Sequence, residues 1–211
     1  LGYTPLMVAS REGHLEVVHY LIHAGSDVNY ADRYQQNTAL ILACGSGQLS
    51  LVQVLVENGA NLNDAQASGF TPLLRAAFYG YTDITEYLLS MGAHADAQDD
   101  FGNTALTYAV KYHHLDTAES LLQQGADLHH RTDEGNTLLM WACFMGHDRV
   151  AQFLIDQGLF TNETNLSGNT ALIFAAQRGN LTIGRLLLEN GAEVNHENRA
   201  DYLPEKVSIS W

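Results

Sequence analysis

The chain is poor in cysteine and in positive charge. Two cysteines among 211 residues are too few for the disulfide framework of a small secreted domain. The 10 Lys and Arg against 24 Asp and Glu give a formal charge of −14, which leaves no basic face for nucleic acid or an anionic membrane surface. No stretch approaches the roughly 18 consecutive apolar residues of a membrane-spanning helix. These absences predict an intracellular, cytoplasmic protein, with the nucleus or a host-cell cytosol as alternatives.

The chain does have enough apolar sequence for a core. Hydrophobic residues make up 46% of it and charged residues 16%, which is typical of a folded domain rather than of a disordered segment. The acidic surplus favours solubility and a partner whose contact surface is basic or apolar. The fold has to come from the order of the residues.

A repeat runs through the chain. The tripeptide Thr4-Pro5-Leu6 recurs with variations, and a later glycine recurs with it. The steps between successive threonines are 34, 33, 33, 33 and 33 residues, and the steps between the glycines are the same. Two marks with one period indicate six copies of one structural unit. The threonines are Thr4, Thr38, Thr71, Thr104, Thr137 and Thr170, and the glycines are Gly25, Gly59, Gly92, Gly125, Gly158 and Gly191.

Each copy predicts a pair of helices. Threonine is a good N-cap, because its hydroxyl accepts a hydrogen bond from an amide of the first turn. Pro5 and Pro72 occupy the first helical position, where proline is favoured. The first helix is expected to end at a glycine such as Gly13 or Gly146, and apolar residues at helical spacing then predict a second helix. The recurring glycine suits a left-handed residue after that helix, and the Asp-, Asn- and Gly-rich stretch beyond it predicts a turn.

These units resemble the ankyrin repeat. The resemblance rests on Thr-Pro-Leu at 4–6, on Gly13-His14-Leu15 and on the segment from Gly25 to Asn29, and it covers essentially the whole chain. It implies an all-α solenoid of stacked antiparallel helix pairs with projecting β-hairpin or turn fingers. The array is expected over residues 1–198, with repeats at about 1–32, 33–65, 66–98, 99–131, 132–164 and 165–197.

Several positions depart from the family pattern. The family often has His three residues after the Thr, and its hydrogen bond must be absent or replaced here. His113 stands where the glycine between the helices is due, so a positive φ is expected for a histidine. The second finger has one extra residue around Tyr34 to Asn37 and lacks the turn glycine, which predicts a bulge. The residues at the His position are Met7, Ile41, Leu74, Thr107, Met140 and Ile173.

Both ends fall within the pattern. Residues 1–3 resemble the tail of a finger, which favours a piece of a longer protein. Residues 198–203 resemble the start of another finger, and Leu203-Pro204 falls where Thr-Pro is due. Residues 198–211 are therefore expected to form a C-terminal cap or a partial seventh repeat, with the cap favoured.

No pattern of residues predicts catalysis, a metal or a cofactor. The adjacent pair His113-His114 and the pair at 129–130 lack a Cys or carboxylate at ligand spacing. Cys44 and Cys143 occupy the same repeat position three copies apart, which predicts two separate core thiols that cannot be bridged. Motifs of hydrolases and metalloproteases are missing, so the chain is expected not to be an enzyme.

Three asparagines allow two interpretations. Asn29, Asn63 and Asn195 occupy one finger position, each eight residues after a leucine. The resemblance implies that they are candidate substrates of an asparaginyl hydroxylase. The simpler interpretation is that these side chains stabilise the finger.

The resemblance also implies where a partner binds, namely the finger tips and the solvent-facing end of each first helix, which line a concave face. The central copies hold aromatic residues there, and clustered exposed aromatics mark binding surfaces. Packing of Phe78 and Phe144 between repeats is the alternative. Tyr108, Trp141 and Phe174, four residues after their Thr, are expected in the core instead. The candidate partner-binding residues are Phe78, Tyr79, Tyr81, Lys111, Tyr112, Phe144, Met145, Arg178, Tyr34, Phe70, Phe101, Asp100 and Glu134, with Asp99 and Asp133 adding to an acidic rim.

The sequence therefore predicts a protein–protein interaction module without catalytic activity, monomeric by itself. Its expected partner is a protein or peptide whose apolar residues are flanked by basic ones, bound on the concave face. The alternative is a targeting segment or passive spacer of a larger multidomain protein, such as a bacterial effector, whose activity lies outside this chain.

Overall fold

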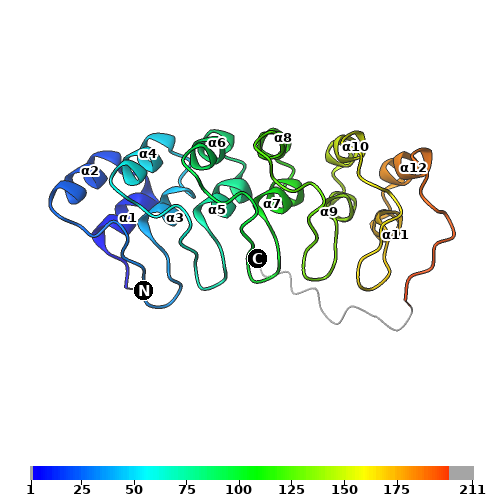
Figure 1. The fold of residues 1–211 in the computed structure, drawn as a ribbon, viewed down its shortest axis with the longest axis horizontal. Coiled ribbons are helices and arrows are strands. Elements are labelled where there is room, and N and C mark those ends of the chain that lie inside the picture. The colour runs from blue at the N-terminus through cyan, green and yellow to red at the C-terminus, as the bar shows by residue number, and fades with distance from the viewer. Residues whose placement is uncertain (1, 200–211) are drawn as a thin grey trace. The chain divides into compact units, whose positions relative to one another are not determined.

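The computed structural model describes residues 2–199, which contain twelve helices and no strand (Figure 1). The chain divides into two compact units, unit 1 over Leu1–His130 and unit 2 over Arg131–Trp211. Unit 1 contains α1 (Pro5–Glu12), α2 (Leu15–His23), α3 (Ala39–Ala43), α4 (Leu49–Glu57), α5 (Pro72–Tyr79), α6 (Thr82–Ser90), α7 (Ala105–Lys111) and α8 (Leu115–Gln123). Unit 2 contains α9 (Leu138–Met145), α10 (Asp148–Asp156), α11 (Ala171–Gln177) and α12 (Leu181–Glu189).

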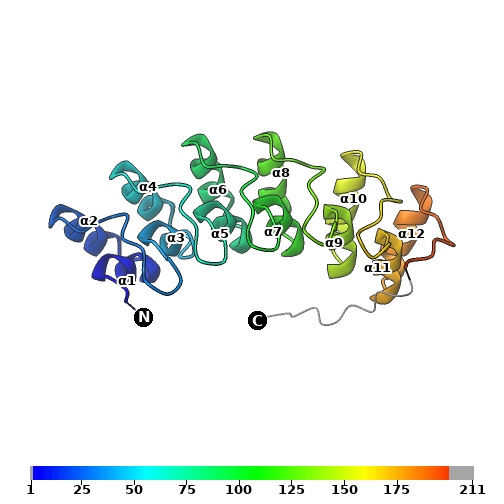
Figure 2. The same cartoon turned by 60° about the horizontal axis from the view of Figure 1, so that its bottom comes forward.

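Within each unit the helices form two rows. In unit 1 the odd-numbered helices pack on one another in chain order, and so do the even-numbered ones (Figures 1 and 2). In unit 2, α9 packs on α11 and α10 on α12. Each odd helix also packs on the even helix that follows it, so helix pairs stack as predicted. We call the odd helices first helices, the even ones second helices, and the loop before each first helix a finger. Within residues 2–199 no helix has the length and hydropathy that a membrane crossing requires.

Threonine caps every first helix, as predicted. In each of the six copies its hydroxyl accepts the N–H three residues on, as between Thr4 Oγ1 and Met7 N at 3.2 Å. The first helices then end at a left-handed residue, for example Gly13 at φ 78° and Gly146 at φ 80°. His113 takes this conformation at φ 65°, so the predicted positive φ at a histidine is confirmed.

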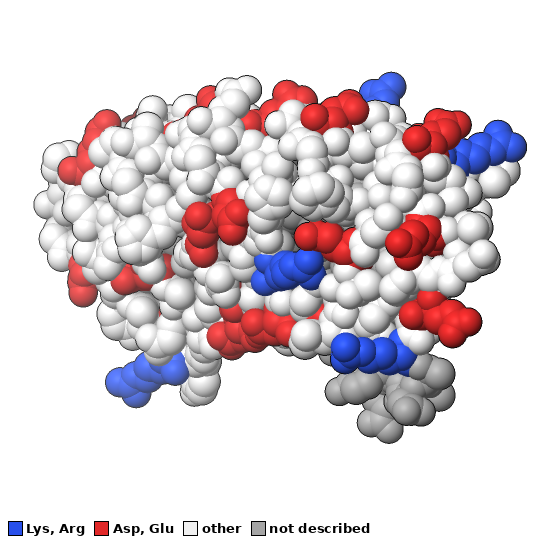
Figure 3. All heavy atoms as spheres, turned by 45° about the vertical axis from the view of Figure 1, so that its right-hand side comes forward, with Lys and Arg blue, Asp and Glu red and all other residues white. Residues whose placement is uncertain are grey.

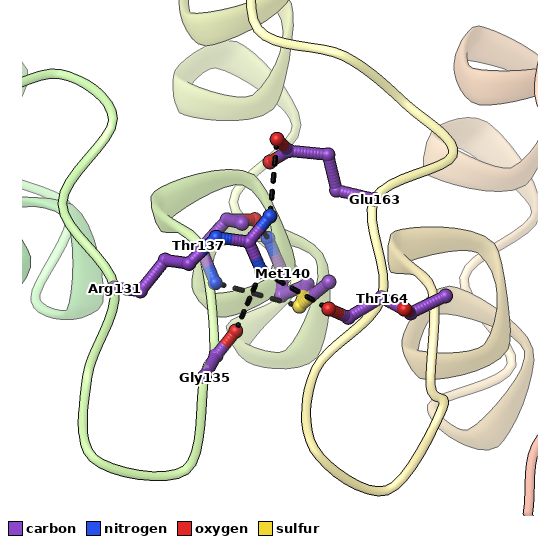
Figure 4. A network of polar contacts seen from close by, with 6 residues as sticks. All are labelled: Arg131, Gly135, Thr137, Met140, Glu163 and Thr164. Atoms are coloured by element: carbon purple, nitrogen blue, oxygen red, sulfur yellow. Dashed lines mark hydrogen bonds and ion pairs between the residues drawn. The ribbon is translucent and has the colours of Figure 1, made fainter.

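Two of the residues at the His position replace a hydrogen bond of the cap. Thr107 Oγ1 accepts the backbone N–H of Thr104 at 3.3 Å, which completes a capping box. In unit 2 the sulfur of Met140 lies 3.4 Å from the backbone N of Thr137 (Figure 4). In these two copies the hydroxyl of Thr107 or the thioether of Met140 thus accepts the backbone N–H of the capping threonine, in place of the histidine that the family often has.

Leucines at equivalent positions of successive copies form the core. Leu40, Leu73 and Leu106 of the first helices are at most 1% exposed in unit 1. The second helices contribute residues such as Leu55 and Leu88, which are fully buried. Burial of a leucine stabilises a fold by roughly 1.5–3 kcal/mol, so each helix pair depends on its neighbours for stability.

The fingers are turns rather than β-hairpins. Two backbone hydrogen bonds close a loop such as the fourth finger, from Asp99 N to Asn103 O and from Gly102 N to Asp99 O, both at 3.0 Å. Successive fingers are joined by another, as between Asp100 N and Ser68 O at 3.1 Å in unit 1. These isolated bonds order the loops without forming a strand in residues 2–199.

In unit 2 an arginine joins two fingers. The Arg131 guanidinium donates to Gly135 O at 3.2 Å and to Thr164 O at 3.0 Å, and it pairs with Glu163 at 3.0 Å (Figure 4). Farther along, Arg199 N donates to Ser167 O at 3.1 Å, so the chain after α12 follows finger six as another finger would. Beyond Arg199, the predicted C-terminal cap or partial seventh repeat lies outside the described residues.

The second finger bulges around a buried carboxylate, as its extra residue predicted. Gln36 has φ 55° at the position that glycine occupies in the other fingers. Asp32 is 1% exposed, and its side chain accepts the backbone N–H groups of Tyr34, Gln35 and Asn37 at 2.8–3.0 Å. Burial by itself raises the pKa of Asp32, but these hydrogen bonds outweigh it and lower the pKa to about 2.

Asp32→Asn is expected to destabilise unit 1 by about 2 kcal/mol at neutral pH, because it weakens hydrogen bonds to a charged group. The folded-state pKa of Asp32 lies below the ordinary value of 3.8, so its contribution to stability is present above that value and is lost as the pH falls toward about 2. Urea unfolding followed by circular dichroism should therefore show the difference between variant and wild type closing across that window. Asp100→Asn, at an exposed carboxylate, is the control. A difference that stays constant with pH would show that the charge of Asp32 is irrelevant.

Candidate functional site

Six aromatic side chains of unit 1 form one continuous cluster. They come from the third finger, from α5 and the turn after it, and from α7. The ring centroid of Phe78 lies 5.0 Å from that of Tyr79 and 4.4 Å from that of Tyr112. Phe70 packs edge-on against Tyr108 at 5.0 Å. We call this set the aromatic cluster, and its members are Phe70, Phe78, Tyr79, Tyr81, Tyr108 and Tyr112.

Part of the aromatic cluster faces solvent. Tyr79 is 43% exposed and Tyr112 is 40% exposed, while Phe70, Phe78 and Tyr81 are half-buried. The two interpretations of Phe78 therefore both describe part of its environment, because its ring packs against four others and still reaches the surface. Neighbouring rings hold one another in place, which lowers the conformational entropy that a partner would have to remove on binding.

Tyr108 connects the aromatic cluster to the fourth finger. It is 8% exposed, which confirms the prediction of a core position for this residue. Its hydroxyl donates a short hydrogen bond to Asp99, which also accepts the N–H of Phe101 at 2.9 Å and that of Asn103 at 2.8 Å. Burial, then the hydrogen bond and the charge of Asp99, raise the pKa of Tyr108, so the phenol stays protonated and donates.

The prediction that Asp99 belongs to an acidic rim is therefore wrong. Asp99 is 7% exposed and is engaged inside the finger, so its carboxylate is not available to a partner. Asp100 and Glu134 are exposed at their finger tips, as is Phe101 at 67%. Tyr34, 74% exposed at the second finger, has no ring contact with the aromatic cluster among the described residues. In the view of Figure 3, acidic side chains form scattered groups rather than one continuous surface.

Two cations lie against the aromatic cluster. The Lys111 ammonium is 5.6 Å from the ring centroid of Tyr108, and the Arg75 guanidinium is 5.4 Å from that of Phe70. Both distances suit cation–π contacts. Lys111 was a predicted site residue, whereas Arg75 was missed. The sequence does contain a signal for Arg75. It is charged at the position four residues after the Thr, where other copies have apolar or aromatic residues such as Leu42 and Tyr108.

Unit 2 has an aromatic group of its own. The Phe144 ring lies edge-on to Trp141 at 6.0 Å and to Phe174 at 5.6 Å. The guanidinium of the exposed Arg178 lies 4.0 Å from the centroid of Phe144, and Met145 is 39% exposed beside it. Trp141 and Phe174 are half-buried, so the expected core position is only partly reached at these two residues.

The asparagines of the fingers bridge neighbouring copies. Asn29 donates to Gly59 O at 2.9 Å and accepts from Asn61 N at 2.8 Å. Asn63 accepts from His94 N at 2.9 Å, whereas Asn195 is exposed. Asn29 and Asn63 thus have the stabilising contacts of the simpler interpretation. Hydroxylation of the three asparagines stays a prediction.

The two thiols are buried and separate. Cys44 and Cys143 are both 0% exposed and unbridged. Burial raises the pKa of both thiols, to about 12 for Cys143, so neither forms a thiolate at neutral pH. Over residues 2–199, no group of His, Cys, Asp and Glu side chains has the arrangement of a metal site.

Comparison with known proteins identifies the fold. A family profile for ankyrin repeats (three copies) matches residues 6–99, 63–132 and 106–198. The crystal structure of the human ASB11 ankyrin repeat domain is similar, with a TM-score of 0.86 and 28% identity over 93% of this chain and 87% of that one. The predicted all-helical repeat fold is therefore confirmed.

Shorter stretches resemble repeats of larger proteins. The putative ankyrin repeat protein FPV031 of fowlpox virus is 40% identical over 76 residues, 36% of this chain and 22% of that protein. Human ankyrin repeat and SOCS box protein 6 is 37% identical over 75 residues, 35% of this chain and 18% of that protein. The chain thus matches less than a quarter of the length of these two relatives. Ankyrin repeats are generally protein–protein interaction modules and typically not catalytic. With the profile spanning residues 6–198, this chain belongs to the ankyrin-repeat family.

Proposed function

We propose that this chain binds a partner protein or peptide through its first helices and finger tips, the surface that lines the concave face of an ankyrin array. The observation that supports the proposal is the aromatic cluster of unit 1, with Tyr79 and Tyr112 each about two-fifths exposed among half-buried rings. Packed rings with one open edge offer a large apolar contact at low entropic cost. Unit 2 has residues of the same kind at its own first helix, the half-buried Phe144 and the exposed Met145.

The finger tips add a charge preference. In unit 1, Asp100 is exposed next to the apolar tip residue Phe101, and in unit 2 Glu134 is exposed at a finger tip. Carboxylates at the rim of an apolar contact favour a partner with Lys or Arg at the matching positions, mainly through the association rate. The proposed partner segment therefore has apolar residues in its centre and basic residues toward the fingers.

The test is a triple substitution, Tyr79→Ala with Tyr112→Ala and Phe144→Ala. The partner is first identified by crosslinking mass spectrometry in the native extract and then purified. We expect its affinity to fall by about a hundredfold or more, because each truncated aromatic removes a contact of the kind that dominates interfaces. Helical content measured by circular dichroism should stay unchanged, since Tyr79 and Tyr112 are partly exposed.

The matched control replaces aromatic residues of similar or greater exposure elsewhere. Tyr20 in α2 is 74% exposed and Phe160 after α10 is 69% exposed. Alanine at these two positions should leave the affinity unchanged. Equal losses in both variants, or full affinity in the triple variant, would show that the aromatic surface of the first helices is not the binding site. A chain that only separates other domains would retain no specific partner.

A further inference from the structure

Arg75 is a charged residue in an otherwise apolar column of first-helix residues. The position four residues after the Thr is Val8, Leu42 and Tyr108 in the other copies of unit 1. Leu42 and Tyr108 are each 8% exposed there, whereas Val8 in the first copy is 40% exposed, so the position is buried between neighbouring copies and open at the first one. Placing a guanidinium in such a column is unfavourable unless its donors are satisfied.

The donors of Arg75 have no acceptor in the described part of the chain. Its Nε is buried and makes no hydrogen bond, and the guanidinium lies over Phe70 without an ion pair. Cys44 is close enough for the charge of Arg75 to oppose the rise in its pKa, but burial dominates and keeps the thiol protonated. The aromatic ring therefore supports the guanidinium, and no neighbouring anion neutralises it.

The fingers explain why Arg75 is unpaired. In the fourth copy the finger residue Asp99 accepts the hydroxyl of Tyr108, the residue of the same column. The equivalent finger residue of the third copy is Gln66, whose side chain donates to Asn37 of the preceding finger. The third copy thus has the cation of the column without a carboxylate from its finger.

Other arginines show what this one lacks. Arg11 also lies over an aromatic ring, that of Tyr3 at 5.6 Å, but it pairs with Glu12 at 2.8 Å. Arg131 in unit 2 pairs with Glu163 at 3.0 Å. These two arginines have a carboxylate partner, whereas Arg75 has none among the described residues, in a chain with 24 Asp and Glu for 10 Lys and Arg.

On the side of the preceding copy, the neighbour of Arg75 is a glycine. Gly45 lies there, and a Cβ added to it would be 3.5 Å from Cε2 of Tyr79 and 3.6 Å from Cδ of Arg75. Because Gly45 has no side chain, nothing from this position lies between Tyr79, which is 43% exposed, and the half-buried Arg75. A tyrosine ring near an arginine side chain forms a surface for an apolar group and a carboxylate next to each other.

We propose that Arg75 binds a carboxylate of the partner protein, an Asp or Glu next to the apolar residue that contacts Tyr79 and Tyr112. The inference rests on the proposed function, since it specifies the partner segment of the same surface. The segment then has both signs of charge, basic toward the finger tips and acidic toward α5. The contact with Phe70 limits the motion of the guanidinium. Because Nε is buried, the carboxylate is expected to accept from the two terminal Nη groups.

The experiment selects binders from a displayed library of random twelve-residue peptides on the wild-type chain, on Arg75→Gln and on Tyr79→Ala/Tyr112→Ala. Wild-type binders are expected to contain Asp or Glu beside an aromatic or aliphatic residue, and binders of Arg75→Gln to lose that preference. Dissociation constants are then measured for the best acidic peptide and for its amide counterpart, with Asn or Gln replacing the acid. Arg75→Gln should weaken the acidic peptide about tenfold and the amide peptide much less.

Two controls separate this role from a structural one. Arg185→Gln removes an exposed arginine of α12 in unit 2, and it should not change the affinity for either peptide. Arg75→Met keeps the apolar stem and removes the unpaired donors, so its urea midpoint should equal or exceed that of the wild type. A large loss of stability in Arg75→Met would show that the guanidinium serves the fold, which contradicts the inference.

The outcomes distinguish the inference from the proposed function. If Tyr79→Ala/Tyr112→Ala abolishes selection but Arg75→Gln weakens both peptides equally or neither, the carboxylate assignment is wrong and the aromatic surface stands. If no selected peptide depends on Tyr79 and Tyr112, both are wrong. An acidic preference that survives in Arg75→Gln would assign the carboxylate to another cation.

Discussion

Asp99→Ala is expected to lower the free energy of unfolding of unit 1 by about 3–4 kcal/mol. The carboxylate is 7% exposed and accepts hydrogen bonds from Phe101 N, from Asn103 N and from the Tyr108 hydroxyl. Its removal leaves several buried donors without an acceptor, and each unsatisfied donor costs about 1–3 kcal/mol. Urea unfolding followed by circular dichroism measures the loss.

The neighbouring residue provides the control for Asp99. Asp100 is exposed at the same finger tip, and Asp100→Ala should change stability by less than about 0.5 kcal/mol. A double-mutant cycle of Asp99→Ala with Tyr108→Phe should give a coupling of at least about 1 kcal/mol, because the two groups share one hydrogen bond. If the two substitutions are additive, or if Asp100→Ala costs as much, the link between the fourth finger and α7 is not what stabilises the finger.

Gly69→Ala is expected to cost about 3 kcal/mol, from two separate causes. Gly69 has φ +79°, where an L-residue with a Cβ is disfavoured by roughly 1–2 kcal/mol. A Cβ at this position would also lie 2.7 Å from Cα of Asp99 and 2.9 Å from the backbone N of Asp100. Because these are backbone atoms of the next finger, the two fingers have to separate, which adds about 1–3 kcal/mol.

Gly59→Ala isolates the second cause. Gly59 has φ +87°, close to that of Gly69, but nothing lies within 4 Å of an added Cβ. This variant should therefore lose only about 1–2 kcal/mol in the same urea titration. Equal losses at the two positions would mean that the close approach between the third and fourth fingers relaxes without cost.

Much of the fold could be predicted because the repeat depends on interactions between residues that are close in the sequence, such as helix caps and turn residues. Thr71 caps α5 and Gly80 ends it in both the expectation and the structure, since each acts on backbone groups within four or five residues. The bulge at Gln36 could be predicted for the same reason, because an insertion changes the length of one loop and leaves its neighbours in register. These features depend on spacing along the chain, which a sequence displays directly.

The candidate site was less predictable. The aromatic positions followed from the register, but Asp99 was assigned to a rim although it is buried against Tyr108, nine residues away. Arg75 is not predicted because its register position is apolar in the other copies and is expected in the core. The period shows which residues are equivalent, and it does not show whether a given side chain has a partner.

The sequence by itself determined the period, the helix pairs, the threonine caps and the aromatic first-helix positions of this protein, because capping, φ preference and helical spacing act over a few residues. Only the tertiary structure decided which of those side chains are satisfied. Asp99 accepts a hydrogen bond from the buried Tyr108 hydroxyl and is itself buried. Arg75 lies over Phe70 and has no carboxylate partner among the described residues. Whether two polar side chains pair depends on their separation in the folded protein. A shift of less than an ångström is enough to break a hydrogen bond.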